Sequence, residues 1–387
     1  MAIERLLLPY RQEVIDDLRF RLNRVRWPEA GGPPGWECGT DRGFLRELCE
    51  YWASDFDWLG TVERLRREME HYLFTADEYA IHFIHRRGRG PDPIPLILTH
   101  GWPGSFLEME AVIPLLTDPG AHGALQADSF DVVVPSLPGF GYSIVPSHPG
   151  TNAQGIAGLW AKLMGELGYE RFAAQGGDIG AGVTTALGLQ FPERLIGIHL
   201  NYLPGSYSPY VAGGPAISQA EAEFLRALGA WEEDQGGYAH IQRTRPLTAA
   251  YGLADSPVGM AAWIIEKFRD WSDCGGDVYT RFTRDALLAN LSLYWTTNTI
   301  GSSFRMYYEG GLTPLTFGAD DFVHVPTAFA AFPHEISRPP RSWIERGYDL
   351  RRWTEMPSGG HFAAAEEPQA FVEDLRAFYR PFRNLRS

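Results

Sequence analysis

The spacing of apolar residues changes along this chain from a helical pattern to a strand pattern, and this change separates its parts. Residues 9–27, 42–53 and 61–71 carry apolar side chains every three or four positions, which predicts amphipathic helices. From Tyr79 onward, short apolar runs between glycines and prolines predict strands at residues 79–86, 95–100, 130–134, 171–175, 195–200, 325–331 and 350–355. Helical patterns recur at residues 153–168, 181–190 and 368–379. Strands alternating with helices favour an α/β fold with a mainly parallel sheet covered on both faces.

The strand pattern is interrupted between residues 206 and 315, where helical segments rich in tyrosine and tryptophan replace it. We expect this segment to be a helical cap inserted into the sheet domain. The chain then divides into four parts. They are an N-terminal helical region packing on the core (1–78), a first core part (79–205), the cap (206–315) and a second core part (316–387).

Composition narrows the class of partner. The chain of 387 residues is 44% hydrophobic and has a net charge of −14, which disfavours nucleic acid or an anionic membrane as a partner. The apolar runs are too short to span a bilayer, and the first residues lack the apolar segment of a signal peptide. Cys38, Cys49 and Cys274 are too scattered for a disulfide framework or a zinc cluster. We therefore expect a soluble, cytoplasmic protein without a membrane anchor or metal.

Asp178 is the most informative residue. It follows the predicted strand 171–175 inside the run Gln175-Gly176-Gly177-Asp178-Ile179-Gly180-Ala181-Gly182, which leads into a predicted helix. Small residues around a central nucleophile are what a sharp strand-to-helix elbow requires. A carboxylate at such an elbow forms an ester by displacement at a saturated carbon, which differs from the chemistry of a serine.

Two further side chains have the order along the chain and the strand-end positions that would complete a triad. His361 follows the last predicted strand and two glycines, which suit a loop that projects an imidazole. Glu335 follows the strand that ends near Phe332, and it is the candidate to orient that imidazole. The order nucleophile, acid, histidine is the one used with this kind of elbow.

Two backbone amides are candidates for an oxyanion hole. One is the amide after the nucleophile, which belongs to Ile179, and the other is that of Trp102 in the loop His100-Gly101-Trp102-Pro103-Gly104. Such donors stabilise the negative oxygen that develops when water attacks the Asp178 ester. The Trp102–Pro103 bond is a candidate for a cis peptide.

These motifs together resemble an α/β-hydrolase-fold epoxide hydrolase of the microsomal type. The matching stretches span nearly the whole chain: Trp27-Pro28, His100–Ser105, Gly176–Asp178, Asp255–Gly259, Phe332-Pro333 before Glu335, and Gly359–Ala364. Unlike the membrane-bound members, this chain is expected to lack a hydrophobic anchor ahead of the N-terminal region. The resemblance therefore implies a soluble enzyme, like the bacterial and fungal relatives.

The resemblance also implies two cap tyrosines that activate the epoxide oxygen. They map to Tyr238 and Tyr307, with Tyr308 an alternative to the second. The chemistry agrees with this, because an alkoxide is a poor leaving group and a phenol can protonate it. Trp102, Tyr308 and Trp263 are further candidates to line an apolar pocket.

The function implied is hydrolysis of an apolar or aromatic epoxide to a vicinal diol through an ester on Asp178. No metal or organic cofactor is expected, and a homodimer is compatible with the sequence. A haloalkane dehalogenase remains an alternative, because Trp102 could hold a halide. The fluoroacetate type is disfavoured, since its substrate-clamping arginines are replaced by residues 179–182. A non-catalytic ligand-binding homologue is the third alternative, although Asp178, Glu335 and His361 are all present.

Overall fold

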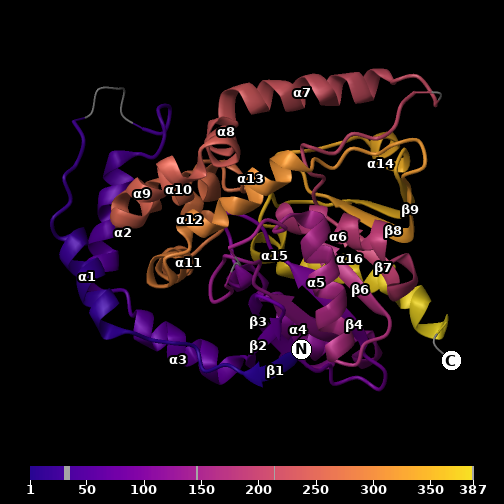
Figure 1. Cartoon of the computed structure of the whole chain (residues 1–387), viewed down its shortest axis with the longest axis horizontal. Coiled ribbons are helices and arrows are strands. Elements are labelled where there is room, and N and C mark those ends of the chain that lie inside the picture. Colours follow the sequence, from indigo (N-terminus) through magenta and orange to yellow (C-terminus); the bar gives the residue numbers. More distant parts are fainter. Residues whose placement is uncertain (30–34, 145–146, 213, 386–387) are drawn as a thin grey trace.

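The computed structural model describes residues 1–29, 35–144, 147–212 and 214–385, and its strands form one twisted sheet, which lies in the right-hand half of the molecule in Figure 1. The nine described strands lie in the order β1-β2-β3-β5-β4-β6-β7-β8-β9. Their bounds are β1 Ala2–Arg5, β2 His71–Ala76, β3 Tyr79–Arg86, β4 Ile94–Thr99, β5 Phe130–Pro135, β6 Phe172–Gly176, β7 Leu195–Leu200, β8 Val323–Ala331 and β9 Tyr348–Glu355. The pairs from β5 to β9 are parallel, whereas β1, β2 and β3 extend one edge in antiparallel pairing. This confirms the predicted mainly parallel sheet.

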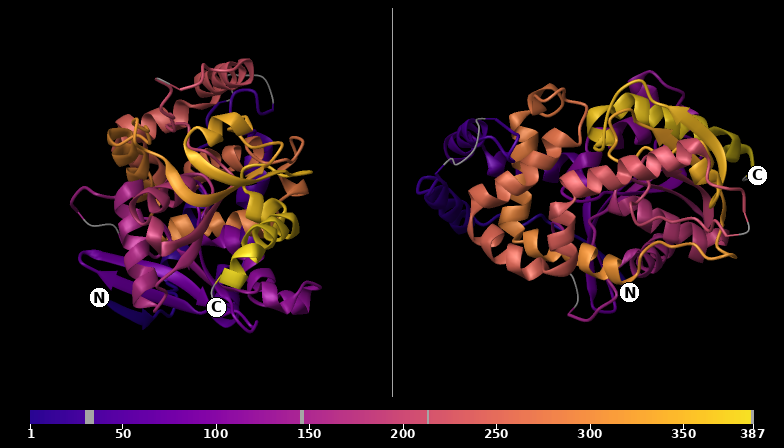
Figure 2. Two further views of the ribbon diagram at one scale, coloured as in Figure 1. Left: turned by 90° about the vertical axis from the view of Figure 1, so that its right-hand side faces the viewer. Right: turned by 90° about the horizontal axis from the view of Figure 1, so that it is seen from above.

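Helices cover both faces of the sheet (Figure 2). The helices of the sheet domain are α4 Val112–Thr117, α5 Ala153–Glu166, α6 Ile179–Gln190, α14 Arg341–Glu345, α15 Ala363–Glu366 and α16 Pro368–Tyr379. Every residue of β4, β5, β6 and β7 is buried, as expected for central parallel strands enclosed by helices. Parallel strands place all their carboxyl ends at one edge, so the loops that follow β4, β6, β8 and β9 meet there.

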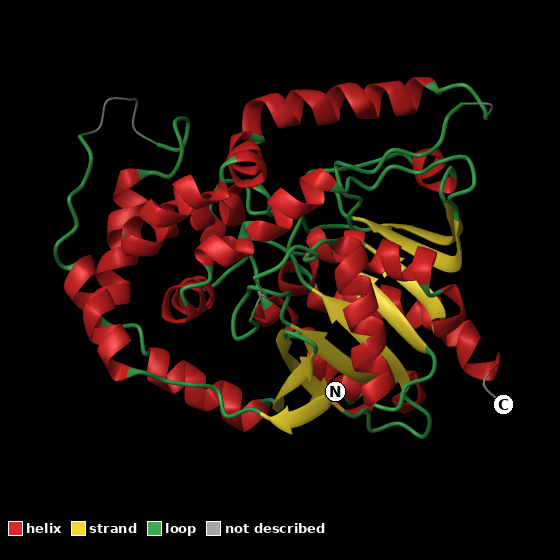
Figure 3. Cartoon of the chain, in the orientation of Figure 1, coloured by secondary structure: helices red, strands yellow, loops and turns green. Residues whose placement is uncertain are grey.

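Helices replace strands between β7 and β8, as the sequence pattern predicted (Figure 3). They are α7 Gln219–Gln235, α8 Gly237–Thr244, α9 Pro246–Asp255, α10 Pro257–Asp270, α11 Arg284–Thr297, α12 Ile300–Ser303 and α13 Arg305–Leu312. Several begin at clear capping signals. Ser218 and Glu221 form a reciprocal capping box at α7, and the Ser256 hydroxyl caps α10, whose first residue is Pro257.

The N-terminal part differs from its predicted form in two ways. Its helices α1 Gln12–Leu22, α2 Arg42–Ser54 and α3 Trp58–Glu68 are present, but β1 and β2 add two strands to the sheet. The pattern missed β2 because its strand character depends on pairing with β3 across a tight turn at Asp77, whose φ is 53°. Helices α1–α3 pack on the helices inserted between β7 and β8 and also on the sheet domain. Trp52 of α2, for example, donates to the Ser292 hydroxyl of α11 at 2.8 Å.

Three buried histidines should make the stability of this core depend on pH. The facing ring nitrogens of His71 and His82 lie 2.9 Å apart, and the other ring nitrogen of His82 lies 2.8 Å from the Ser136 hydroxyl. Burial lowers the pKa of His71 and of His100 to about 4, and that of His82 well below its ordinary value. The unfolded chain takes up these protons near pH 6.5, whereas the folded chain does not. Stability that is present above pH 6.5 is therefore lost as the pH falls towards 4.

We expect the free energy of unfolding in urea to fall by about 1.4 kcal/mol per pH unit for each neutral histidine below pH 6.5. The measurement compares wild type with His71→Gln at pH 7 and at pH 5. The variant should lose less stability over this interval, because it has one buried imidazole fewer. Equal losses in the two proteins would contradict the assignment.

Candidate active site

Asp178 stands in the short turn between β6 and α6. β6 ends at Gly176 and α6 begins at Ile179. The backbone of Asp178 has φ 49° and ψ −126°, a conformation that costs a non-glycine residue about 1–3 kcal/mol. The start of α6 lies so close to β4 that a Cβ on Gly180 would come within 2.0 Å of the Thr99 carbonyl oxygen. The turn therefore has the strained, closely packed geometry of a nucleophile elbow.

The loop after β4 approaches Asp178 from the neighbouring strand end. The Trp102 N–H donates to Asp178 Oδ1 at 2.8 Å, and a Cβ on Gly101 would come within 2.3 Å of the Asp178 side chain. The Trp102–Pro103 bond is cis. Asn290 of α11 donates its side-chain amide to the Pro103 carbonyl at 2.9 Å. The inserted helices thus hold this loop against the carboxylate.

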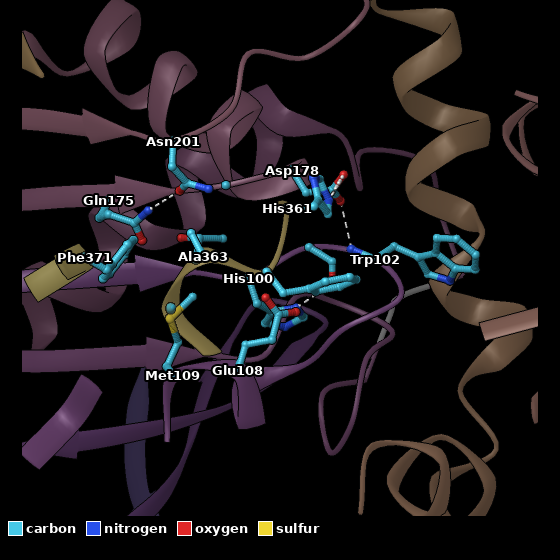
Figure 4. Close-up of a pocket in the computed structure, with 15 residues that line it drawn as sticks. His100, Trp102, Glu108, Met109, Gln175, Asp178, Asn201, His361, Ala363 and Phe371 are labelled. Carbon is cyan, nitrogen blue, oxygen red and sulfur yellow. Dashed lines mark hydrogen bonds and ion pairs between the residues drawn. The ribbon is translucent and has the colours of Figure 1, made fainter. Parts of the chain in front are cut away.

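The two oxygens of Asp178 have different neighbours. Oδ1 accepts the hydrogen bond from Trp102, while Oδ2 lies 3.3 Å from Nε2 of His361. Figure 4 shows both contacts around the Asp178 side chain. Ile179 begins α6 and lines a cavity together with Asp178. Within the described part of the chain its amide makes no hydrogen bond to the carboxylate, so its part as the second oxyanion donor stays a prediction.

The loops after β8 and β9 bring Glu335 and His361 together. Nδ1 of His361 lies 2.6 Å from Oε1 of Glu335, and the same oxygen accepts the Ile336 N–H at 2.7 Å. Both side chains are buried, with relative exposures of 4% for Glu335 and 6% for His361. The three residues singled out from the sequence therefore form a continuous chain, carboxylate–imidazole–carboxylate.

This arrangement determines the charge of His361. Burial alone lowers the pKa of the imidazole, but the carboxylates of Glu335 and Asp178 outweigh it and hold that pKa well above its ordinary value. With both carboxylates ionised, His361 is an imidazolium at neutral pH. Its basicity depends on the Asp178 charge, because one of the two groups that raise its pKa is that carboxylate.

A second buried glutamate, Glu366, braces the backbone around His361. One carboxylate oxygen accepts the N–H groups of Gly360 at 3.0 Å and Asp273 at 2.7 Å, and the other accepts that of Phe362 at 3.0 Å. Amides on both sides of His361 are thereby fixed. The sequence analysis did not single out Glu366, because nothing in its spacing shows that its side chain folds back onto the preceding loop.

The inserted helices place two tyrosines beside Trp102. Tyr238 of α8 stacks on the Trp102 ring, with centroids 5.1 Å apart and planes 11° apart, and the Tyr307 ring of α13 lies edge-on, with its centroid 5.9 Å from that of Trp102. The two phenol rings are also neighbours of each other, edge to face with centroids 5.9 Å apart. Burial raises the pKa of both, and the Asp178 charge raises it further. Both are protonated at neutral pH and can donate a proton.

Two predicted pocket residues lie elsewhere. Tyr308 is 45% exposed, because one step along α13 turns its side chain away from the face that carries Tyr307. Trp263 is half-buried on α10, and this helix packs against α1 and α2. Trp263 lines neither of the two cavities that reach Asp178. These positions correct both pocket predictions.

Tyr202 and Trp271 are aromatic neighbours of His361. The Tyr202 ring stands perpendicular to the imidazole with centroids 5.3 Å apart, and it lines the same cavity as Tyr307. The centroids of the Trp271 ring and the imidazole lie 5.1 Å apart, and the backbone carbonyl of Trp271 accepts the backbone N–H of His361 at 2.9 Å. Tyr202 was missed from the sequence, although it follows the carboxyl end of β7 and so reaches the edge where the site forms.

Two cavities meet at Asp178. The larger one, of about 740 Å³, is open to the surface and is lined by Asp178, Tyr202, Tyr238 and Tyr307. The smaller one, of about 20 Å³, lies behind Asp178 and His361 (Figure 4). In the described part of the chain no cluster of three His, Cys, Asp or Glu side chains is arranged to bind a metal ion. Nor is any described helix long and apolar enough to cross a membrane.

An aspartate on a nucleophile elbow, paired with a buried histidine–glutamate couple at the edge of this sheet, defines the class as an α/β hydrolase. Residues 94–202 match the family model described as alpha/beta hydrolase fold, and residues 3–109 match the one described as epoxide hydrolase N terminus. A relative from Stigmatella aurantiaca is 43% identical over 373 residues, covering 96% of this chain and 83% of that protein. Epoxide hydrolase 1 of Oryctolagus cuniculus is 37% identical over 393 residues, covering 95% and 86%.

A solved structure agrees with these matches. The crystal structure of juvenile hormone epoxide hydrolase from the silkworm Bombyx mori superimposes with a TM-score of 0.87 at 29% identity, covering 100% of this chain and 96% of that one. The chain belongs to the epoxide hydrolase family. The resemblance inferred from its motifs is thereby confirmed, and the epoxide hydrolase interpretation takes precedence over the dehalogenase and binding-protein alternatives.

Proposed function

We propose that this enzyme hydrolyses apolar or aromatic epoxides to vicinal diols through a covalent ester on Asp178. The observation that carries the proposal is the surroundings of one carboxylate. Asp178 has a backbone donor on one oxygen and His361 beside the other, and it lines a cavity together with Tyr238 and Tyr307. A nucleophile, a base and two acids are thus available around a space that admits an organic molecule.

In the first step, Oδ2 of Asp178 attacks one epoxide carbon, and the bond from that carbon to the ring oxygen breaks. The ring oxygen takes a proton from the pair Tyr238 and Tyr307, whose raised pKa values keep them protonated until then. Oδ1 stays bound to the Trp102 amide and becomes the ester carbonyl oxygen. The products of this step are a hydroxyalkyl ester and one tyrosinate, which regains its proton later in the cycle.

In the second step, His361 acts as a base. Ester formation removes the Asp178 charge, so one of the two groups that raised the His361 pKa is gone. His361 becomes less basic and releases its proton, which balances the proton that the tyrosinate regains, and the neutral imidazole can then accept a proton from water. Hydroxide attacks Cγ of Asp178, and the Trp102 amide stabilises the negative charge on Oδ1, an effect worth about 3 kcal/mol per donor in serine enzymes. Collapse releases the diol and restores the carboxylate.

The inserted helices serve in this proposal as a cap over the site. They carry both tyrosines, and Trp231, Met306 and Leu315 give the larger cavity apolar walls. The stacked Trp102 and Tyr238 rings favour flat apolar substituents near the reacting carbon. Such walls contribute affinity through burial of apolar surface without fixing one substrate.

Replacing each tyrosine tests the division of roles. Tyr238→Phe and Tyr307→Phe should each slow ester formation by about 100-fold, because each removes one donor to the ring oxygen. Tyr308→Phe is the matched control, and it should leave the rate unchanged since Tyr308 is exposed. The measurement is single-turnover ester formation with excess enzyme over a styrene-like epoxide. If Tyr308→Phe is as slow as Tyr307→Phe, the assignment of the second donor is wrong.

We also propose a cytoplasmic location. The three cysteines are unpaired, which suits a reducing compartment, and the net charge is −14. A homodimer stays a prediction.

A further inference from the structure

The connector between α10 and α11, residues 271–283, lies against the loop that carries His361. The backbone carbonyl of Trp271 accepts the backbone N–H of His361. A Cβ on Gly360 would come within 2.6 Å of the Trp271 carbonyl oxygen and 2.9 Å of the Asp273 nitrogen, so position 360 has no room for a side chain. This part of the cap therefore belongs to the immediate frame of the base.

Asp273 of the connector contacts both loops that form the buried His361–Glu335 couple. Its Oδ2 accepts the N–H of Gly359, two residues before His361, at 3.0 Å. Its Oδ1 lies 3.2 Å from Nε2 of His334, the residue before Glu335. The two loops also meet directly, because the His334 N–H donates to the Gly359 carbonyl at 3.1 Å. One carboxylate of the cap thus bridges the two loops whose side chains have to stay in contact.

Arg281 holds the Asp273 carboxylate in this place. Its guanidinium donates to Oδ2 of Asp273 at 2.7 Å, to the Asp273 backbone carbonyl at 2.6 Å and to Oε1 of Glu367 at 2.6 Å. The same Glu367 oxygen accepts the Ser358 hydroxyl at 2.6 Å. The Gly359 amide and the neighbouring Arg281 keep the pKa of Asp273 below its usual range, so the bridge is an ionised carboxylate at neutral pH.

The connector also reaches the acid of the first chemical step. The centroid of the Trp271 ring lies 5.2 Å from that of Tyr238 and 5.1 Å from that of His361. Trp271 therefore lies between the phenol and the imidazole, and Asp273 follows it by two residues. The same short segment of the cap contacts groups that act in both steps.

We propose that Asp273 is a positioning residue for ester hydrolysis: it fixes the loop of His361 against the loop of Glu335, so that the imidazole keeps its contact with the glutamate. This inference rests on the proposed ester mechanism and extends it, since the cap then serves the second step as well as the first. Asp273 lines neither of the two cavities that reach Asp178, so it acts through the loops and not on the substrate.

The test measures the two chemical steps separately. Asp273→Ala removes both bridging oxygens. It should slow ester hydrolysis by about 10- to 100-fold, the range expected when a base is displaced by up to about 1 Å, while ester formation changes less than about threefold. Asp273→Asn keeps a carbonyl oxygen for the Gly359 N–H and should restore most of the hydrolysis rate. Ester formation and decay are followed after rapid mixing with a styrene-like epoxide, by acid quench and mass measurement of the intact protein.

A pH profile of ester hydrolysis separates positioning from a general loss of structure. The rate should rise with pH as His361 in the ester loses its proton. The Glu335 carboxylate raises the pKa of His361, so a longer contact in Asp273→Ala lowers that pKa. The rise should then move by about 0.5–1 pH unit towards lower pH. Asp273→Asn should keep the wild-type profile, because it keeps the bridge.

Asp277→Ala is the matched control. Asp277 lies in the same connector and is exposed, and its carboxylate accepts the Tyr279 N–H at 3.0 Å within the connector itself. This variant should leave both steps and the pH profile unchanged.

Hydrolysis at the wild-type rate in Asp273→Ala would overturn the inference. An equal slowing of both steps would also overturn it, since the whole cap would then be displaced. So would slower hydrolysis without a shift of the pH profile, or a rate that Asp273→Asn does not restore. In all these cases the wild-type enzyme still forms its ester. Absence of any ester in the wild-type enzyme would instead contradict the proposed function itself.

Discussion

Asp178→Asn is expected to lower kcat/KM for epoxides by a factor on the order of 10⁴ or more, without loss of the fold. The amide has the shape of the carboxylate and can still accept the Trp102 N–H through Oδ1. It lacks the negative oxygen that must attack carbon, so no ester forms. The measurement is diol production, together with the mass of the protein after incubation with substrate, which should show no adduct.

Asp178→Ser provides the companion result. A serine at this elbow would restore the nucleophile of ester hydrolases, but its alkyl ether product with an epoxide could not be hydrolysed by attack at a carbonyl. The variant should therefore make no diol catalytically. Diol formation by either variant at more than a small fraction of the wild-type rate would contradict a nucleophilic role.

Isotope labelling checks the same step without a mutation. A single turnover in ¹⁸O-water should place the label in the Asp178 carboxylate, because water attacks Cγ and the original Oδ2 leaves in the diol. Peptide mass analysis locates the label. Label in the diol and none in Asp178 would show direct attack of water on the epoxide.

Much of the site could be predicted because its residues follow strand ends. Asp178, Glu335 and His361 lie in the loops that follow β6, β8 and β9, and parallel strands bring such ends together. Their types and order along the chain then specify the chemistry. The Trp102 loop follows β4 and was found by the same reasoning.

What escaped the sequence depends on side-chain direction or on long-range pairing. The local sequence does not show whether residue 307 or residue 308 of α13 faces the site. Packing against Trp102 determines that Tyr307 does. Glu366 folds back onto the loop that precedes it, which spacing does not encode. The N-terminal strand β1 has only four residues and owes its existence to the β2 edge.

His361→Gln should separate the two steps and leave the enzyme trapped as its ester. Glutamine cannot accept a proton from water, so hydrolysis should slow by about 10³-fold or more. Attack by Asp178 does not require a base, because a carboxylate is itself the nucleophile and the tyrosines supply the proton. Ester formation should therefore continue, and the protein should gain the mass of one substrate molecule, which intact-protein mass spectrometry measures.

Glu335→Gln is the graded control for this result. The glutamine amide still contacts Nδ1 of His361, but the substitution removes one of the two carboxylates that raise the imidazole pKa. The imidazole becomes a weaker base, so hydrolysis should slow less than in His361→Gln, and the ester should accumulate only in part. The order of ester accumulation is then His361→Gln, Glu335→Gln, wild type, with Asp178→Asn showing none. A His361→Gln protein that is inactive but carries no adduct would show that the imidazole is needed for ester formation. That result would contradict the assignment of His361 to the second step alone.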